Sequence, residues 1–344
     1  MSTIRENTPQ TIRHAYLIIA YDKFEQLAFQ LSLLDDPRND IFIHMDKRTS
    51  FSEQDKQTLQ KAVTYSKVYF TPRIAVYWGH FSLVESELIL YKMASEKGPY
   101  AMYHLISGAD MPLRSQDTIH AFFADKLDQI FITRYNQEEA EELKLHKLVE
   151  HYHLSRRINP RNLSPIPRKI LRAYQILENK IQTVLKVDRL RGKRKEMGFD
   201  GFSEWKSIGH DVVLAILANE DWIRKQFRFT FCSDEYFFPM TLKRAQLLER
   251  IYHYEPVNDV PDEFQGNLRY VNWWDGHPYE WTDSPADMAQ LDKGRELGHF
   301  FSRKFNLEKY PALKDYILEK VKEWESPSNR IHSLPQMESK KKTL

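Results

Sequence analysis

The sequence has 344 residues, an ordinary apolar content and a net charge of +2, which fits one large domain or two smaller ones. A charge this close to zero gives no overall signal for nucleic acid or for an acidic surface, so any basic patch must be local. The single cysteine, Cys232, excludes a disulfide within the chain and favours a reducing compartment. Between Phe231 and Ser233, a cysteine is more often a small core residue than a nucleophile.

The two ends of the sequence are polar. Residues 1–13 lack the apolar run of a signal peptide, and no window reaches the roughly 18 apolar residues that a membrane span needs. We therefore expect a cytoplasmic protein. Residues 326–344 contain proline and several lysines and have no periodicity, so we expect a disordered tail there.

The first half of the chain alternates between short apolar runs and stretches with helical spacing. Strands are expected at 14–20, 41–46, 66–72, 101–107 and 128–134, with helices at 24–34 and 80–97. Strands that alternate with helices predict an α/β fold with a doubly wound, mostly parallel sheet.

Ligands of such sheets bind outside the carboxyl ends of the strands. Here these ends are 20–22, 44–46 and 107–110. Neither G-x-G-x-x-G nor G-x-x-x-x-G-K-[ST] occurs, so a dinucleotide fingerprint and a P-loop are both unsupported.

The middle of the chain, 155–196, is strongly basic, opens with several prolines and has helical spacing over about 166–187. Three interpretations stay open: a solvated insertion, a patch for a polyanionic or lipid-phosphate substrate, and an anchor on an anionic membrane. RNA binding is less favoured, because the basic residues lack interleaved aromatic residues.

The second half returns to compact patterns. Residues 201–219 predict a strand or turn that leads into a helix near His210. A further helix is expected at 244–254, a strand and an aromatic loop at 267–281, and mostly helix from 292 to 324 with an interruption around 306–311.

No D-x-D triplet is present to hold a divalent cation against a diphosphate, and the 13 histidines lack zinc spacing. A bound diphosphate would therefore need cationic side chains. The segment 299–306 supplies Arg303 and Lys304 between phenylalanines, although exposed Arg-Lys pairs are common.

Two aromatic segments allow more than one interpretation. In FCSDEYFFPM, at 231–240, Asp234 and Glu235 fit the start of a helix, or a general base whose pKa is raised by burial. In the loop NWWDGHPYEW, Trp273 and Trp274 suit stacking on a sugar ring and suit core packing equally well.

Taken in order, several segments resemble the core-2/I-branching β-1,6-N-acetylglucosaminyltransferase family, which includes peptide O-xylosyltransferases. The segments are YLIIAYDKFEQL, IFIHMDKR, WGHFSLVESE, YHLISGADMPL, GFSEWKSI, SDEYFF, RYVNWWDGHP and FFSRKFN. They span about residues 14–306 and leave out the basic middle. The resemblance implies an inverting GT-A-type glycosyltransferase that uses a UDP-sugar, with no metal and no cofactor.

The resemblance also implies roles for individual residues. Glu235 is expected to deprotonate the acceptor hydroxyl, and Asp234 to be its structural neighbour. Lys304, helped by Arg303, is expected to hold the diphosphate in place of a metal. The remaining expected contacts are Ala20, Tyr21, Asp22 and Asp46 for the nucleotide, Ser107, Gly108 and Asp110 for the sugar-diphosphate, and Trp205, Trp273 and Trp274 for the acceptor.

The chain departs from the animal members, which are cysteine-rich and membrane-anchored, and so resembles a bacterial cytoplasmic relative. Such relatives build capsular, exopolysaccharide or other surface glycans on a lipid-diphosphate carrier, which would bring the basic middle to the inner face of the cell membrane. An arginine that the family places shortly before the lysine segment has no clear counterpart here. UDP-GlcNAc is the default donor, while UDP-xylose, UDP-galactose, UDP-glucose and UDP-galactofuranose stay open.

We expect one glycosyltransferase domain over 14–325, with a nucleotide-binding half at 14–135, a basic helical insertion at 136–200 and a catalytic and acceptor half at 201–325. Two other classes stay open. One is a non-catalytic protein that binds glycan or lipid phosphate, and the other is a different nucleotide-sugar enzyme, such as a glycosyl-phosphate transferase.

Overall fold

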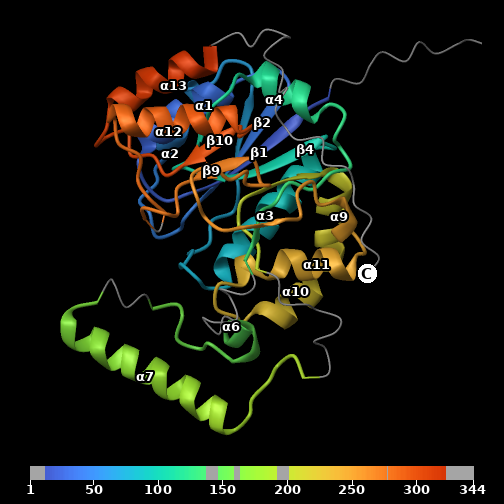
Figure 1. Ribbon diagram of the computed structural model, residues 1–344, viewed down its shortest axis with the longest axis vertical. Helices are drawn as coiled ribbons and strands as arrows, with labels where there is room; N and C mark the ends of the chain where they lie inside the picture. Colours follow the sequence, from blue (N-terminus) through green and yellow to red (C-terminus); the bar gives the residue numbers. More distant parts are fainter. Residues whose placement is uncertain (1–11, 137–145, 159–162, 192–200, 277, 323–344) are drawn as a thin grey trace, which may run out of the picture.

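The computed structural model describes residues 12–136, 146–158, 163–191, 201–276 and 278–322. Its centre is a five-stranded sheet in which four strands run parallel and the last, β7, runs antiparallel to β4 (Figure 1). The strand order is β3 (Lys67–Phe70), β2 (Asn39–Met45), β1 (His14–Ala20), β4 (Met102–Ser107) and β7 (Lys206–Gly209). Every residue of β1 and β2 is buried, as the continuous apolar runs predict for strands covered on both faces.

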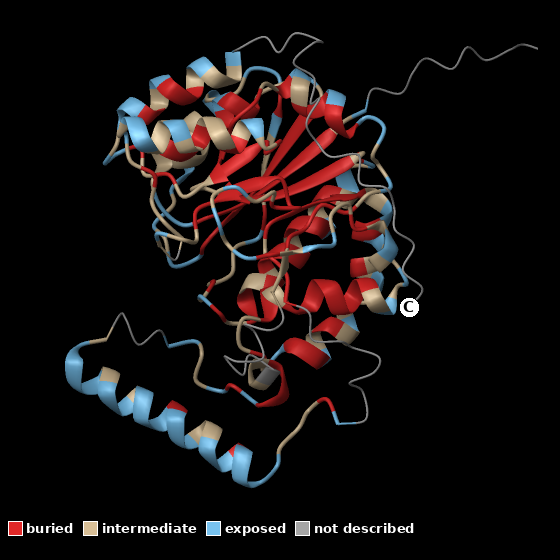
Figure 2. Cartoon of the chain, viewed as in Figure 1, coloured by how far each residue is buried: buried red, intermediate tan, exposed pale blue. Residues whose placement is uncertain are grey.

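Helices cover both faces of the sheet, which confirms the doubly wound α/β fold. One face carries α1 (Phe24–Leu34), α2 (Glu53–Lys61) and α4 (Gln116–Phe123); the other carries α3 (Ser82–Lys97), α9 (His210–Ala218), α10 (Glu220–Phe227) and α11 (Phe237–Arg244). Successive residues of β1 enter different cores, since Leu17 packs with the α3 side and Ile18 with the α1 side. Figure 2 shows the buried residues concentrated along the sheet and these helices.

A smaller sheet extends the carboxyl edge. It consists of β5 (Met111–Pro112), β10 (Phe301–Arg303) and β9 (Arg269–Val271), and it packs against α12 (Pro285–Glu296) and α13 (Ala312–Lys322). The remaining elements are β6 (Arg134–Tyr135), β8 (Pro256–Val257), α6 (His146–Glu150), α7 (Pro165–Val184) and the 3₁₀ turns η2 (Ser233–Glu235) and η3 (Leu248–Arg250).

Three sequence predictions are wrong. Residues 128–134 are not a strand of the main sheet, since Ile130 and Phe131 form only isolated bridges there. The helix expected at 244–254 is only the turn η3, because Gln246 has a φ of 58° and the chain then extends at Ile251 to bridge Ile130. The stretch after 292 is helical only to Glu296 and again from Ala312, because β10 lies between the two helices, so the interruption is longer than the one expected around 306–311.

The helix expected at 166–187 is observed as α7, which lies apart from the main body in Figure 1. Parts of the basic stretch, 159–162 and 192–196, lie outside the described residues, as does the tail at 326–344. Among the helices of the described ranges, none is long and apolar enough to cross a bilayer.

Candidate active site

The antiparallel direction of β7 brings a second set of side chains to the carboxyl edge of the sheet. Lys206, at the start of β7, pairs with Leu105 near the end of β4. The residues just before β7, Glu204 and Trp205, therefore lie beside the carboxyl end of β4, where the sequence predicted a ligand.

The segment that carries Glu235 is held by backbone hydrogen bonds on both sides. Cys232 has a left-handed φ of 52°, and its N–H donates to the Gly79 carbonyl at 2.9 Å. The N–H of Phe202 donates to the Glu235 carbonyl at 3.1 Å. Gly79 itself has a φ of 68°, and a Cβ there would collide with the ring of Phe231, so this approach requires glycine.

The helix-cap interpretation of the two acids is not supported. Residues 233–235 form η2, and α11 begins only at Phe237 with Tyr236 at its N-cap. Asp234 is buried, and its Oδ1 atom has no hydrogen-bond partner among the described residues. A buried carboxylate oxygen without a donor is costly to ionise, which makes this pair unusual for a purely structural turn.

Burial raises the pKa of both acids, and repulsion from Asp234 raises that of Glu235 further. Glu235 is half-buried, and burial followed by the charge of Asp234 raises its pKa to about 8. Burial raises the pKa of Asp234 to about 6, against the opposing influence of Lys206. The two carboxyls titrate as a pair, so these values describe the pair together.

Two further acids and a lysine complete the cluster, and the sequence analysis did not identify them. Glu204 has a pKa well above its ordinary value, because of burial and then the charges of Asp234 and Glu87. Lys206 Nζ lies 2.7 Å from Glu87 Oε2, and both side chains are fully buried. Burial raises the pKa of Glu87 to about 7, although Lys206 opposes the rise.

Arg303 links this acidic cluster to the predicted nucleotide edge. Its guanidinium carbon lies 4.7 Å from the centre of the Trp205 ring, and its charge also favours ionisation of Glu204 and Tyr21. The charge of Lys304 likewise favours ionisation of Asp22. The pKa of Asp22 is nevertheless raised, chiefly by burial. Arg303, Lys304, Tyr21, Asp22 and Glu204 are thus brought together from distant parts of the sequence.

The other predicted contacts of the nucleotide and the sugar-diphosphate lie at the same edge. Asp46, Ser107 and Asp110 already form hydrogen bonds within the protein there. The Asp46 carboxylate accepts hydrogen bonds from the backbone and side chain of Arg48, which lower its pKa despite burial. Asp110 accepts from the Ser107 N–H and hydroxyl.

The loop between Ser107 and Asp110 is tied to the cationic segment. The N–H of Phe305 donates to the Ala109 carbonyl at 3.0 Å, and Gln26 Nε2 donates to the Gly108 carbonyl at 2.8 Å. Ala20 is buried next to Gly108, so a Cβ at this glycine would lie 3.3 Å from the Ala20 Cβ.

The predicted acceptor tryptophans have different environments. Trp205 is buried under Arg303, Trp273 is half-buried, and Trp274 packs on Tyr270 at a ring separation of 5.6 Å. The neighbouring loop residue Trp281 is fully buried and stacks on Tyr270 at a ring separation of 5.9 Å. Trp274 and Trp281 therefore serve core packing, and the acceptor role of Trp205 and Trp273 stays a prediction.

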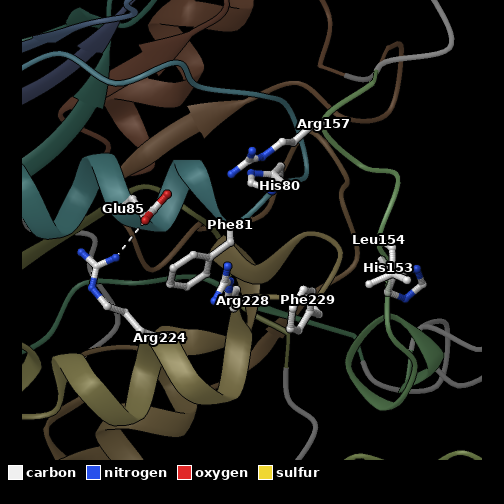
Figure 3. A pocket seen from close by; sticks show the side chains of 9 residues that line it. All are labelled: His80, Phe81, Glu85, His153, Leu154, Arg157, Arg224, Arg228 and Phe229. Carbon is white, nitrogen blue, oxygen red and sulfur yellow. Dashed lines mark hydrogen bonds and ion pairs between the residues drawn. The ribbon is translucent and has the colours of Figure 1, made fainter.

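A separate pocket of about 440 Å³ lies at the start of α3, between α10 and the segment that leads to α7 (Figure 3). It is lined by His80, Phe81, Glu85, His153, Leu154, Arg157, Arg224, Arg228 and Phe229. Arg224 is paired with Glu85 at 2.8 Å, whereas Arg157 and Arg228 are exposed at the pocket. None of the predicted site residues lines it.

No group of three or more histidine, cysteine or acidic residues is arranged to hold a metal ion within the described ranges. The doubly wound α/β sheet has buried acids and cations at its carboxyl edge. This arrangement is typical of an α/β enzyme with a ligand site at that edge. More particularly, the chain belongs to the core-2/I-branching enzyme family, a glycosyltransferase family, because the family model "Branch: Core-2/I-Branching enzyme" matches residues 14–292.

Curated relatives agree with this assignment. Xylosyltransferase 1 of Canis lupus familiaris is 27% identical over 317 residues, and that of Rattus norvegicus is 26% identical over 320 residues; each match covers 86% of this chain. The human protein is 28% identical over 133 residues, which are 38% of this chain. The matches cover 29%, 34% and 14% of these relatives, so the chain spans about a third of their length or less.

Two solved structures are similar at low identity. Mouse xyloside xylosyltransferase 1 in its apo form has a TM-score of 0.38 at 13% identity, covering 86% of this chain and 99% of that one. Core-mannan synthase A of Aspergillus fumigatus, in its Mn/GDP form, has a TM-score of 0.32 at 14% identity, covering 70% and 72%.

Proposed function

We propose that this protein transfers a sugar from a UDP-sugar to a hydroxyl of a glycan acceptor, with inversion at the anomeric carbon and without a metal. The observation that carries the proposal is the position of Glu235. This half-buried carboxyl, with a pKa of about 8, belongs to an acidic cluster that Arg303 connects to the carboxyl edge of the sheet.

In the proposed reaction, the Glu235 carboxylate accepts the proton of the acceptor hydroxyl as its oxygen attacks the anomeric carbon. The bond between that carbon and the diphosphate oxygen breaks in the same displacement, and UDP leaves with the bonding electrons. We propose that Arg303 and Lys304 stabilise the negative charge that develops on the diphosphate, and their positions beside Trp205 and Asp22 support this role. One displacement needs one base, and a pKa near 8 makes the ionised carboxyl a stronger base than an ordinary glutamate.

For the identity of the donor sugar, we propose a group of candidates. UDP-GlcNAc is our first choice, with β-1,6 linkage, and UDP-xylose gains weight because the curated relatives are xylosyltransferases. We further propose that the acceptor is a bacterial surface glycan, such as a capsular or exopolysaccharide chain on a lipid-diphosphate carrier, and that the protein acts in the cytoplasm.

The test is a screen of UDP-sugars for slow hydrolysis, with UDP release as the readout, because it needs no knowledge of the acceptor. We expect one donor to be hydrolysed fastest, with the same rate in EDTA. Release of UMP instead would identify a glycosyl-phosphate transferase, and a strict need for Mn²⁺ would contradict the role of the two cations. Absence of any UDP or UDP-sugar binding by calorimetry would favour a non-catalytic binding protein.

A further inference from the structure

The helix α7 is attached to the protein through its polar side. Gln182 accepts a hydrogen bond from the Tyr152 N–H at 2.7 Å and donates to the Tyr152 carbonyl at 2.8 Å. Glu178 accepts from the Leu154 N–H at 3.2 Å, and Gln175 donates to the Ser155 hydroxyl at 3.2 Å. Gln175 and Gln182 are the buried residues of this helix.

The apolar side of α7 faces away from these contacts. Large apolar residues recur at steps of three and four along one face, and their exposed fractions lie between 46% and 79%. They are Ile166, Ile170, Tyr174, Leu177, Ile181 and Val184. This reverses the usual arrangement, in which the apolar face of a surface helix packs on the core. Figure 2 shows α7 exposed along most of its length.

The charges that α7 exposes have one sign. Lys169, Arg172 and Lys180 are exposed, and Lys186 follows just after the helix. The one acidic residue of the helix, Glu178, lies on the attached side and accepts the Leu154 hydrogen bond. A partner with negative charge and an apolar interior would complement this surface, whereas a second copy of α7 would bring like charges together.

We propose that α7 lies in the plane of an anionic lipid bilayer, with its apolar stripe in the acyl region and its lysines at the headgroup phosphates. A 20-residue amphipathic helix with basic residues beside its apolar face has the composition of an interfacial helix. Its length is about 30 Å at 1.5 Å per residue, which gives a long contact parallel to the surface. The proposal rests on α7 alone and does not depend on the enzymatic activity.

The test is sedimentation of the full chain with vesicles of phosphatidylcholine mixed with phosphatidylglycerol, compared with phosphatidylcholine alone. We expect binding to the anionic vesicles that weakens as salt is added. Leu177→Glu combined with Ile181→Glu should weaken it by at least about tenfold, because two apolar side chains no longer enter the bilayer. The matched control is Leu214→Glu, at a residue of α9 that is 49% exposed, which should bind as the wild type does.

A second pair of variants separates charge from apolar contact. Lys169→Gln with Lys180→Gln should weaken binding and reduce its salt dependence, while Lys92→Gln on exposed α3 surface should not. Absence of binding to anionic vesicles, or binding that the α7 variants leave unchanged, would overturn the proposal. So would a wild-type dimer in analytical ultracentrifugation that Leu177→Glu dissociates, since the stripe would then bind a second copy.

Discussion

The edge around Glu235 and the helix α7 depart from ordinary protein structure in opposite directions. Around Glu235 the protein buries acids and cations among aromatic rings, and around α7 it exposes a continuous apolar stripe to solvent. Each arrangement costs free energy in the isolated protein, the first through lost hydration of charge and the second through exposed apolar surface. A small polar ligand could offset the cost around Glu235. An extended apolar surface could offset the cost at α7.

The largest expected effect concerns the buried pair of Lys206 and Glu87. Lys206→Met should lower the free energy of unfolding by about 3 kcal/mol or more, because Glu87 loses its partner in the interior. Urea denaturation measures this, and adding Glu87→Gln should recover part of the loss. Ile170→Glu on α7 should change stability by no more than about 0.5 kcal/mol. Equal losses at the two sites would show that the buried ion pair is no more important for stability than an exposed apolar residue of α7.

The next effect is on turnover. Glu235→Gln should lower kcat by about 10²-fold or more, since the amide cannot accept the acceptor proton, while UDP binding measured by calorimetry persists. Glu53→Gln, at a side chain that is 80% exposed, is the matched control. Near-normal turnover of Glu235→Gln would remove this residue from the mechanism.

The pH dependence follows from the raised pKa of Glu235. The base must be ionised to act, and its pKa is raised from 4.5 to about 8, so activity is lost at a higher pH than an ordinary glutamate would give. We expect kcat/KM to fall about tenfold for each pH unit below about 8. A profile that stays flat between about pH 6 and 9 would show that the free enzyme needs no such group.

The smallest effect on function is expected at the cationic segment. Lys304→Ala should weaken UDP binding by about tenfold while uridine binding stays the same, because only the diphosphate loses a charge-assisted contact. Lys309→Ala nearby, which removes an exposed cation paired with Glu280, should leave both unchanged. Equal weakening of uridine and UDP would place Lys304 away from the diphosphate.

Much of the sheet could be predicted from the sequence, because the strands that are buried on both faces are continuous apolar runs, as at His14–Ala20. The wrong predictions lie where tertiary contacts determine the backbone conformation. Residues 244–254 have helical spacing, yet the positive φ of Gln246 and the bridge between Ile251 and Ile130 end the helix early. Local periodicity carries no information about such a bridge.

For the candidate site, sequence reasoning selected Asp234 and Glu235 but not Glu204, Glu87 and Lys206, the further charged residues of the buried cluster. A buried ion pair between residues 119 positions apart has no local signature, since each member looks like an ordinary charge on its own element. One signal was available: Glu204 lies directly before Trp205 and Lys206, which open β7. Because β7 runs antiparallel to β4, an acid just before β7 lies at the same edge as the carboxyl ends of the parallel strands.

On the proposed role of Arg303 in binding the diphosphate, its contact with Trp205 gives the site an internal optical reporter. A buried indole with a guanidinium 4.7 Å from its ring centre emits differently once that cation is drawn towards an anion. Donor occupancy should therefore be measurable from intrinsic fluorescence, without a label and before any acceptor is known. Trp205→Phe should remove the signal while the six other tryptophans remain.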